Sequence, residues 1–164
     1  MKIVKTDLIQ HGIQGHVDVI THGCNCRNIM GAGIAKQMVN MFPEINIQSS
    51  LSPVNKLGTI ECFDYYVSPQ YSTPPVFLQQ SILYPIIVKD TLTVVNCFTQ
   101  LNIGKNLDYV ALRMCLKKLN LTFPENTRIG LPKIGAGIAG GDWDLIKELI
   151  EEELTNQQVT ICLL

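Results

Sequence analysis

Two glycine-rich segments carry the residue types in this chain that could do chemistry. The first reads Met30-Gly31-Ala32-Gly33-Ile34-Ala35, and the second reads Ile134-Gly135-Ala136-Gly137-Ile138-Ala139-Gly140. A glycine loop that leads into a helix lets backbone N–H groups converge on an anion, supported by the positive end of the helix dipole. Because one such loop binds one phosphate, two similar loops predict a ligand with two phosphates, such as a diphosphate.

A polar run just before the first glycine loop adds side chains that could act on such a ligand. It reads Thr21-His22-Gly23-Cys24-Asn25-Cys26. Histidine titrates near neutral pH and suits general acid or base chemistry, so His22 is a candidate catalytic residue. Asn25 is the second candidate, because its amide can donate and accept hydrogen bonds to a sugar. The alternative interpretation is an ordinary turn or a capped strand end.

A carboxylate near the N-terminus, in Val4-Lys5-Thr6-Asp7-Leu8, is a third candidate. The Asp7 side chain could accept a hydrogen bond from the exocyclic amine of a base. Taken alone, the residue is more typical of a turn or a helix cap.

The elements that must position these residues alternate between strands and helices. Apolar and β-branched runs predict strands over 2–5, 17–22, 59–67, 92–98, 128–134 and 159–163, with a proline-rich loop over 68–75. Helical spacing begins near Gly33 and ends at Pro43, recurs from Leu107 to Met114, and begins again after Asp142, a suitable N-cap. This alternation predicts an α/β fold with a mixed or largely parallel sheet. Ligands of such sheets bind beyond the carboxyl ends of the strands, where both glycine loops fall.

Composition limits the class of protein. With 164 residues, 46% hydrophobic and 16% charged, the chain is expected to form one globular domain over 1–164. A net charge of −1 gives no electrostatic reason for bulk nucleic-acid binding. We find no signal peptide and no membrane span, and expect a cytoplasmic protein. The six cysteines lack the spacing of zinc or redox pairs, so we expect reduced thiols, no metal site and no cofactor.

A dinucleotide-binding domain is an alternative, because the second loop matches Gly-x-Gly-x-x-Gly. That interpretation needs an acidic residue about 20 positions later, at the end of the next strand, to bind a ribose. Here the next strand runs to Leu164 without one. The glycines could instead serve only tight turns, but two similar loops make that interpretation less favourable than it would be for one.

Taken together, these segments resemble a macrodomain, the ADP-ribose-binding fold. The resemblance rests on Val4 to Leu8, Val17 to Pro43, Val94 to Gln100 and Ile129 to Trp143, and it spans the whole chain. It implies a three-layer α/β/α arrangement around a central mixed, largely parallel sheet. The His-Gly-Cys-Asn-Cys segment is similar to that of phosphatases acting on ADP-ribose-1″-phosphate. The run from Asn25 to Pro43 also resembles antitoxin macrodomains that remove ADP-ribose from DNA, a branch that includes enzymes acting on protein glutamates.

The resemblance implies a role for each site residue. Asp7 would bind the adenine amino group with the backbone of Leu8 nearby, Asn25 would bind the distal ribose, and His22 would approach that ribose and its 1″ substituent. The residues expected to surround the diphosphate or line the remaining pocket are Gly31, Ala32, Gly33, Ile34, Ala35, Thr99, Gln100, Ile134, Gly135, Ala136, Gly137, Ile138, Ala139 and Gly140.

The sequence also departs from the de-ADP-ribosylating branch. Those enzymes use a lysine where this chain has Gln100, and glutamine can neither form a Schiff base nor act as a base. Lys105 lies five residues further on. Some relatives have a catalytic aspartate at the position of Ala139.

Three functions therefore remain open. We hypothesise a phosphatase that converts ADP-ribose-1″-phosphate to ADP-ribose and phosphate, with His22 acting on water or on the leaving oxygen. The alternatives are a hydrolase that removes ADP-ribose from DNA or protein, and a non-catalytic ADP-ribose reader. The expected partner is a small ADP-ribose derivative. We expect a monomer, no membrane partner, and no nucleic acid except as an ADP-ribosylated substrate.

Overall fold

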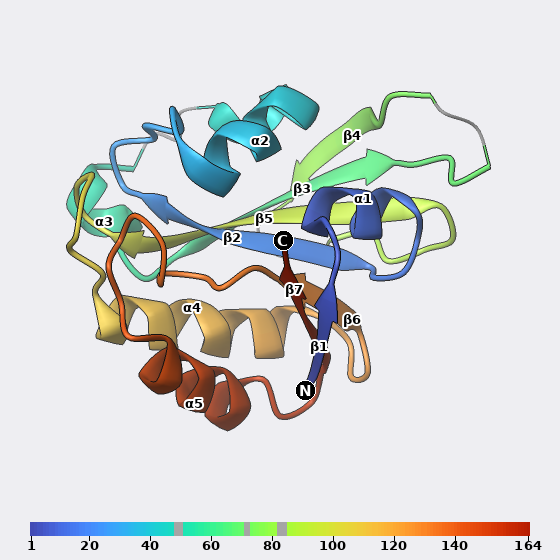
Figure 1. Cartoon of the computed structure of the whole chain (residues 1–164). Coiled ribbons are helices and arrows are strands. Elements are labelled where there is room, and N and C mark those ends of the chain that lie inside the picture. The colour runs from blue at the N-terminus through green and yellow to red at the C-terminus, as the bar shows by residue number, and fades with distance from the viewer. Residues whose placement is uncertain (48–50, 71–72, 82–84) are drawn as a thin grey trace.

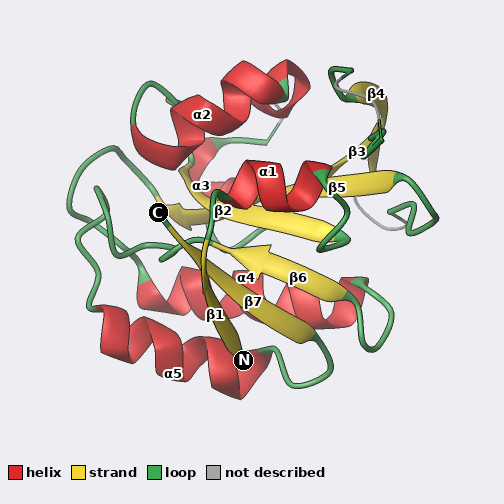
Figure 2. Ribbon diagram, turned by 45° about the vertical axis from the view of Figure 1, so that its right-hand side comes forward, coloured by secondary structure: helices red, strands yellow, loops and turns green. Residues whose placement is uncertain are grey.

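The chain folds around one seven-stranded sheet (Figures 1 and 2). The computed structural model describes residues 1–47, 51–70, 73–81 and 85–164. The sheet has the order β1-β7-β6-β2-β5-β3-β4. Its strands are β1 (Lys2–Lys5), β2 (Val19–Asn25), β3 (Ile60–Tyr66), β4 (Val76–Ser81), β5 (Thr91–Gln100), β6 (Arg128–Leu131) and β7 (Gln158–Leu163). Strands β1, β7, β6, β2 and β5 are parallel to one another, whereas β3 pairs antiparallel with β5 and β4. The predicted mixed, largely parallel α/β sheet is confirmed.

Helices cover both faces of this sheet. Helices α1 (Leu8–Ile13) and α2 (Gly33–Met41) lie on one face, and α4 (Tyr109–Thr122) and α5 (Trp143–Glu153) lie on the other (Figure 1). Two short elements, the 3-10 helix η1 (Pro43–Asn46) and helix α3 (Pro53–Lys56), precede β3. The arrangement is the three-layer α/β/α fold that the resemblance implied.

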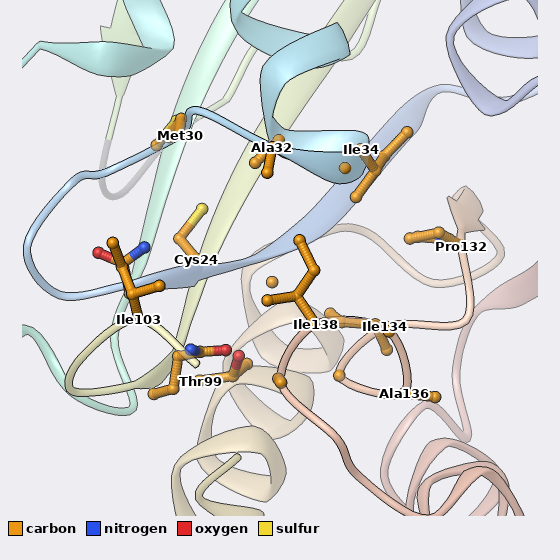
Figure 3. Close-up of a pocket in the computed structure, with 18 of the residues that line it drawn as sticks. Cys24, Met30, Ala32, Ile34, Thr99, Ile103, Pro132, Ile134, Ala136 and Ile138 are labelled. Atoms are coloured by element: carbon orange, nitrogen blue, oxygen red, sulfur yellow. The ribbon is translucent and has the colours of Figure 1, made fainter. Parts of the chain in front are cut away.

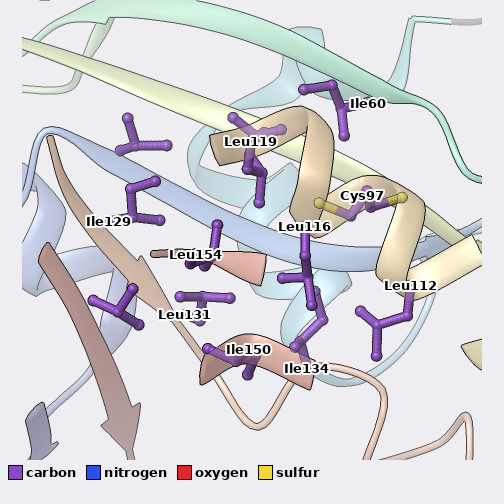
Figure 4. Packing of buried hydrophobic residues seen from close by; sticks show 14 of the residues in the cluster. Ile60, Cys97, Leu112, Leu116, Leu119, Ile129, Leu131, Ile134, Ile150 and Leu154 are labelled. Atoms are coloured by element: carbon purple, nitrogen blue, oxygen red, sulfur yellow. The ribbon is translucent and has the colours of Figure 1, made fainter. Parts of the chain in front are cut away.

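Each face has its own hydrophobic core. On one side, Leu112 and Leu116 of α4 and Ile150 of α5 pack against sheet residues such as Ile129 (Figure 4). On the other side, buried residues of α1 and α2, including Leu8 and Met38, pack against the opposite sheet face. Since a parallel sheet with short polar loops needs both faces covered, the alternation of apolar strands and amphipathic helices selects this architecture.

Local signals in the sequence set several element boundaries. Helix α2 ends just before Pro43, as predicted, and Asp142 caps α5 by accepting hydrogen bonds from the N–H groups of Asp144 and Leu145. Strand β5 runs two residues further than expected, to Gln100. The expected loop over 68–75 includes residues 71–72, which lie outside the described part of the chain.

All six cysteines are free and buried. In the part of the chain that the structure describes, none of the helices has the length and apolar character needed to traverse a bilayer.

Candidate ligand-binding site

The two glycine loops meet at one cavity of about 630 Å³ (Figure 3). The first loop connects β2 to α2, and the second follows β6 and leads to α5. Strands β2 and β6 are parallel neighbours, so their carboxyl ends open at the same edge of the sheet. This shared edge brings together two loops that are far apart in the sequence.

Most of the expected site residues line this cavity. They are Asn25, Gly31, Ala32, Gly33, Ile34, Ala35, Thr99, Gln100, Ile134, Gly135, Ala136, Gly137, Ile138 and Ala139. The four that do not line it are Asp7, Leu8, His22 and Gly140.

The loops offer backbone donors to this cavity. Within the described residues, the N–H groups of Gly31, Ala32, Gly137 and Ile138 make no hydrogen bond to protein, although all four residues line the cavity. Unpaired N–H groups at a helix start and in a tight glycine turn form a favourable environment for an anion. The loop geometry therefore supports the phosphate-binding interpretation of the sequence.

His22 lies in the interior of the protein and does not line the cavity. Its side chain is fully buried, its Nε2 is 2.9 Å from Asn96 Oδ1, and the Asn96 amide in turn donates to Ile45 O. Burial lowers the pKa of His22 to about 4, so the ring is neutral near pH 7. Cys24 Sγ is 3.7 Å from both ring nitrogens, which places the sulfur beside the ring rather than in line with one nitrogen. From the sequence we predict that His22 lies against the ligand. In the structure it lies instead in a buried hydrogen-bonded network.

The other three residues outside the lining have local structural roles. Asp7 caps α1, with its Oδ1 2.7 Å from the Gln10 nitrogen, as the capping alternative predicted. Leu8 is buried in the core, where it faces Gly130. Gly140 has a φ of +72° and packs against the side chain of Lys105. Base recognition by Asp7 and Leu8 stays a prediction.

Three polar side chains of β2 and β5 lie at the cavity. The Asn25 amide donates to Ile29 O at 2.8 Å, and its oxygen accepts from two backbone N–H groups of the same loop. The Gln100 amide donates to Asn102 O at 2.7 Å and Gly104 O at 3.2 Å. The hydroxyl of Thr99 is buried and has no hydrogen-bond partner among the described residues. Buried polar groups are normally bonded, so this hydroxyl is available to a ligand or a water molecule.

Eight of the lining residues lie outside the set of site residues that the sequence predicted. They are Gly23, Cys24, Ile29, Met30, Ile103, Gly104, Pro132 and Lys133. Lys133 is the most informative, because its cation lies 5.6 Å from the centre of the Trp143 ring and no Asp or Glu of the described chain lines the cavity. Its place directly before the second glycine loop was a signal in the sequence. Burial raises the pKa of the Cys24 thiol well above its ordinary value, which argues against a nucleophilic thiolate.

Metal chemistry has no obvious location in this part of the molecule. Among the residues that the structure describes, no three His, Cys, Asp or Glu side chains gather closely enough to hold an ion. The cavity therefore offers backbone donors, one lysine and neutral polar groups, a combination suited to an anionic ligand that also carries hydroxyl groups.

Comparison with known proteins agrees with the fold. The sequence matches no protein-family model. It is 30% identical over 169 residues to an uncharacterized 17.5 kDa protein from the tk-vs intergenic region of Enterobacteria phage T4, covering 98% of this chain and 94% of that protein, so the two belong to one family. A Bacteroides thetaiotaomicron protein of unknown function is 26% identical, with a TM-score of 0.69 and 99% and 97% of the two chains covered.

The macrodomain of Thermus aquaticus DarG aligns with a TM-score of 0.62 over 99% of this chain and 97% of its own, at 19% identity. The chain has the macrodomain fold. Thermosipho africanus DarTG, solved in complex with ADP-ribose, matches this chain with a TM-score of 0.66 and 16% identity, over 99% of this chain and 41% of the DarTG chain. These likenesses show the fold of the chain.

Proposed function

We propose that this macrodomain binds ADP-ribose in the cavity between its two glycine loops. The observation that carries the proposal is the set of unpaired N–H groups at Gly31, Ala32, Gly137 and Ile138, which belong to both loops and line one cavity. A diphosphate between the loops would accept hydrogen bonds from both sides, assisted by the Lys133 cation. The DarTG likeness supports the same ligand, because that protein was solved with ADP-ribose.

Binding is the function that the geometry supports best. Neither a histidine nor a carboxylate is among the described residues that line the cavity, and the Lys133 side chain there lies beside the Trp143 ring, so the geometry supports binding of an anion more directly than it supports a general acid or base. Hydrolysis of ADP-ribose-1″-phosphate, and removal of ADP-ribose from DNA or protein, are therefore further hypotheses that rest on the sequence resemblance.

One experiment separates these functions. Calorimetric titration with ADP-ribose is compared with ADP, AMP and ribose, and binding should be strong only where a diphosphate is present. Phosphate release from ADP-ribose-1″-phosphate would demonstrate a phosphatase activity in addition to binding. Release of ADP-ribose from a modified oligonucleotide or glutamyl protein would demonstrate a hydrolase activity. Absence of ADP-ribose binding, or binding of AMP as tight as that of ADP-ribose, would overturn the proposal.

A further inference from the structure

The carboxyl ends of β2 and β5 hold a pair of amide side chains. Asn25 and Gln100 are register partners across the two parallel strands. Each amide is bonded to backbone groups of the loop that follows its own strand. The two loops are also joined, because Arg27 Nε donates to Asn102 Oδ1 at 3.1 Å.

Gln100 organises the second of these loops, residues 101–104. Its side-chain nitrogen has two hydrogens, and two carbonyl oxygens of this loop, those of Asn102 and Gly104, accept from it. Gln100 is 8% exposed, so these bonds form largely out of water. Ile103 and Gly104 of this loop line the cavity. A side chain at the end of β5 therefore fixes a part of the cavity wall that neither glycine loop provides.

This third wall is in turn tied to the second glycine loop. The Leu107 N–H donates to Ala139 O at 3.2 Å, and the side chain of Lys105 packs against Gly140. The Asp108 N–H donates a hydrogen bond to Thr99 O at 2.9 Å, which connects the end of this segment to β5. A displacement of residues 101–104 would thus be transmitted to the second glycine loop and to the end of β5.

We propose that Gln100 is a positioning residue, whose amide N–H groups hold residues 101–104 as the third wall of the cavity. In this role the nitrogen of the amide matters and its oxygen does not. The inference rests on the proposed function only in so far as ADP-ribose affinity reports the shape of the cavity.

Two substitutions distinguish this role from direct contact between Gln100 and the ligand. Gln100→Glu keeps the size and the acceptor oxygens but removes the donors, and it sets a carboxylate against two carbonyl oxygens. Gln100→Lys keeps N–H donors that can reach the same carbonyls. If Gln100 positions the wall, the lysine variant should resemble the native protein and the glutamate variant should not. Both variants also change the charge beside an anionic ligand, so the order of the two affinities alone does not separate the two roles, and the ordering of the backbone in residues 101–108 of the ligand-free protein decides between them.

Gln157 offers a matched control. Its amide also donates to two carbonyl oxygens, those of Asn120 and Phe123, each at 3.2 Å, and it does not line the cavity. Gln157→Glu therefore removes the same kind of contact elsewhere in the molecule. We expect both glutamate variants to lower the melting temperature.

The readouts are hydrogen exchange in the ligand-free protein and calorimetric affinity for ADP-ribose. Gln100→Glu should speed exchange at the Asn106, Leu107 and Asp108 amides and weaken binding about tenfold, whereas Gln100→Lys and Gln157→Glu should do neither. Unchanged exchange in Gln100→Glu, or tighter binding by Gln100→Glu than by Gln100→Lys, would overturn the inference. If the native protein does not bind ADP-ribose, the proposed function fails, and the exchange measurement still decides the role of Gln100.

Discussion

Ile138 of the second glycine loop contacts Gly33 of the first, where a Cβ atom would lie 3.3 Å from Ile138 Cδ1. Figure 3 shows the Ile138 side chain pointing from its own loop toward the opposite wall of the cavity. Gly33 has a φ of +57°, a left-handed conformation that disfavours other residues. The contact joins the two loops across the cavity. Glycine is therefore favoured at position 33 for two reasons, the positive φ of the backbone and the close approach of the Ile138 side chain.

The glycines of the loops should therefore differ in what they tolerate. Gly33→Ala should lower the free energy of unfolding by about 1 kcal/mol, because alanine is strained at positive φ. Gly137 has open space where a Cβ atom would lie and no positive φ, so Gly137→Val should leave stability nearly unchanged while its side chain narrows the cavity. Urea denaturation and ADP-ribose titration measure the two effects. Equal affinity of Gly137→Val and the native protein would argue against this wall as a ligand contact.

The unpartnered hydroxyl of Thr99 gives a second prediction. Thr99→Val removes a buried polar atom at almost constant volume, so the free energy of unfolding should stay the same or rise by up to about 1 kcal/mol. If a ligand uses the hydroxyl, the same variant should bind ADP-ribose a few-fold more weakly. Thr21→Val is the control, because the Thr21 hydroxyl is bonded to Val95 O at 3.1 Å and this variant should lose stability. A destabilised Thr99→Val would show that the hydroxyl has a partner in solution.

Buried His22 should make stability depend on pH. Its pKa is about 4 in the folded protein because burial disfavours the charged ring, against about 6.5 in an unfolded chain. The unfolded state thus binds the extra proton first as the pH falls. The contribution of neutral His22 to the free energy of unfolding should be fully present above about pH 6.5. It should decrease as the pH falls toward 4, by an amount on the order of 3 kcal/mol.

His22→Gln should remove this dependence, because a glutamine does not titrate. Denaturation curves collected between about pH 7.5 and 4.5 test the difference between the two proteins. His11→Gln is the comparison at a less buried histidine, whose pKa is lowered mainly by partial burial. Identical pH profiles for the native protein and His22→Gln would contradict the prediction.

Lys133 should contribute to affinity in a salt-dependent way. Since its side chain is exposed, Lys133→Met should weaken ADP-ribose binding only about two- to fivefold at low ionic strength. The difference should shrink at high salt, where exposed charges are screened. Lys117→Met, at an exposed position of α4 away from the cavity, controls for the change in net charge. A loss of affinity that is the same at all salt concentrations would indicate a packing role for Lys133.

The meeting of the two glycine loops was predictable from sequence, because carboxyl ends of parallel strands share one edge of a sheet. The depth of the cavity along β2 was not. His22 shares a face of the strand with Cys24, which lines the cavity, and Gly23 of the other face lines it as well, so alternation alone does not say how far back along β2 the cavity reaches. In the structure Gly23 lines the cavity, and His22 points into the core toward Asn96.

The position of residues 101–104, the third wall of the cavity, was also not predictable from the sequence. Gln100 was expected to line the pocket, at the position of a lysine in related enzymes, but not to hold a loop. Its bonds to Asn102 O and Gly104 O depend on the path of a loop that has no periodic pattern. The Asp7 cap, in contrast, was one of the stated alternatives, since an aspartate before an apolar helix is a local signal.

The pairing of β1 with β7 has a consequence for how the protein folds. Among the described strands, β1 pairs only with β7, so residues 2–5 gain their sheet partner only once residues 160–163 are in place, more than 150 positions further along the chain. Contacts between such distant segments carry a large entropic cost of loop closure, so this edge of the sheet should be among the last parts to become ordered and should slow folding.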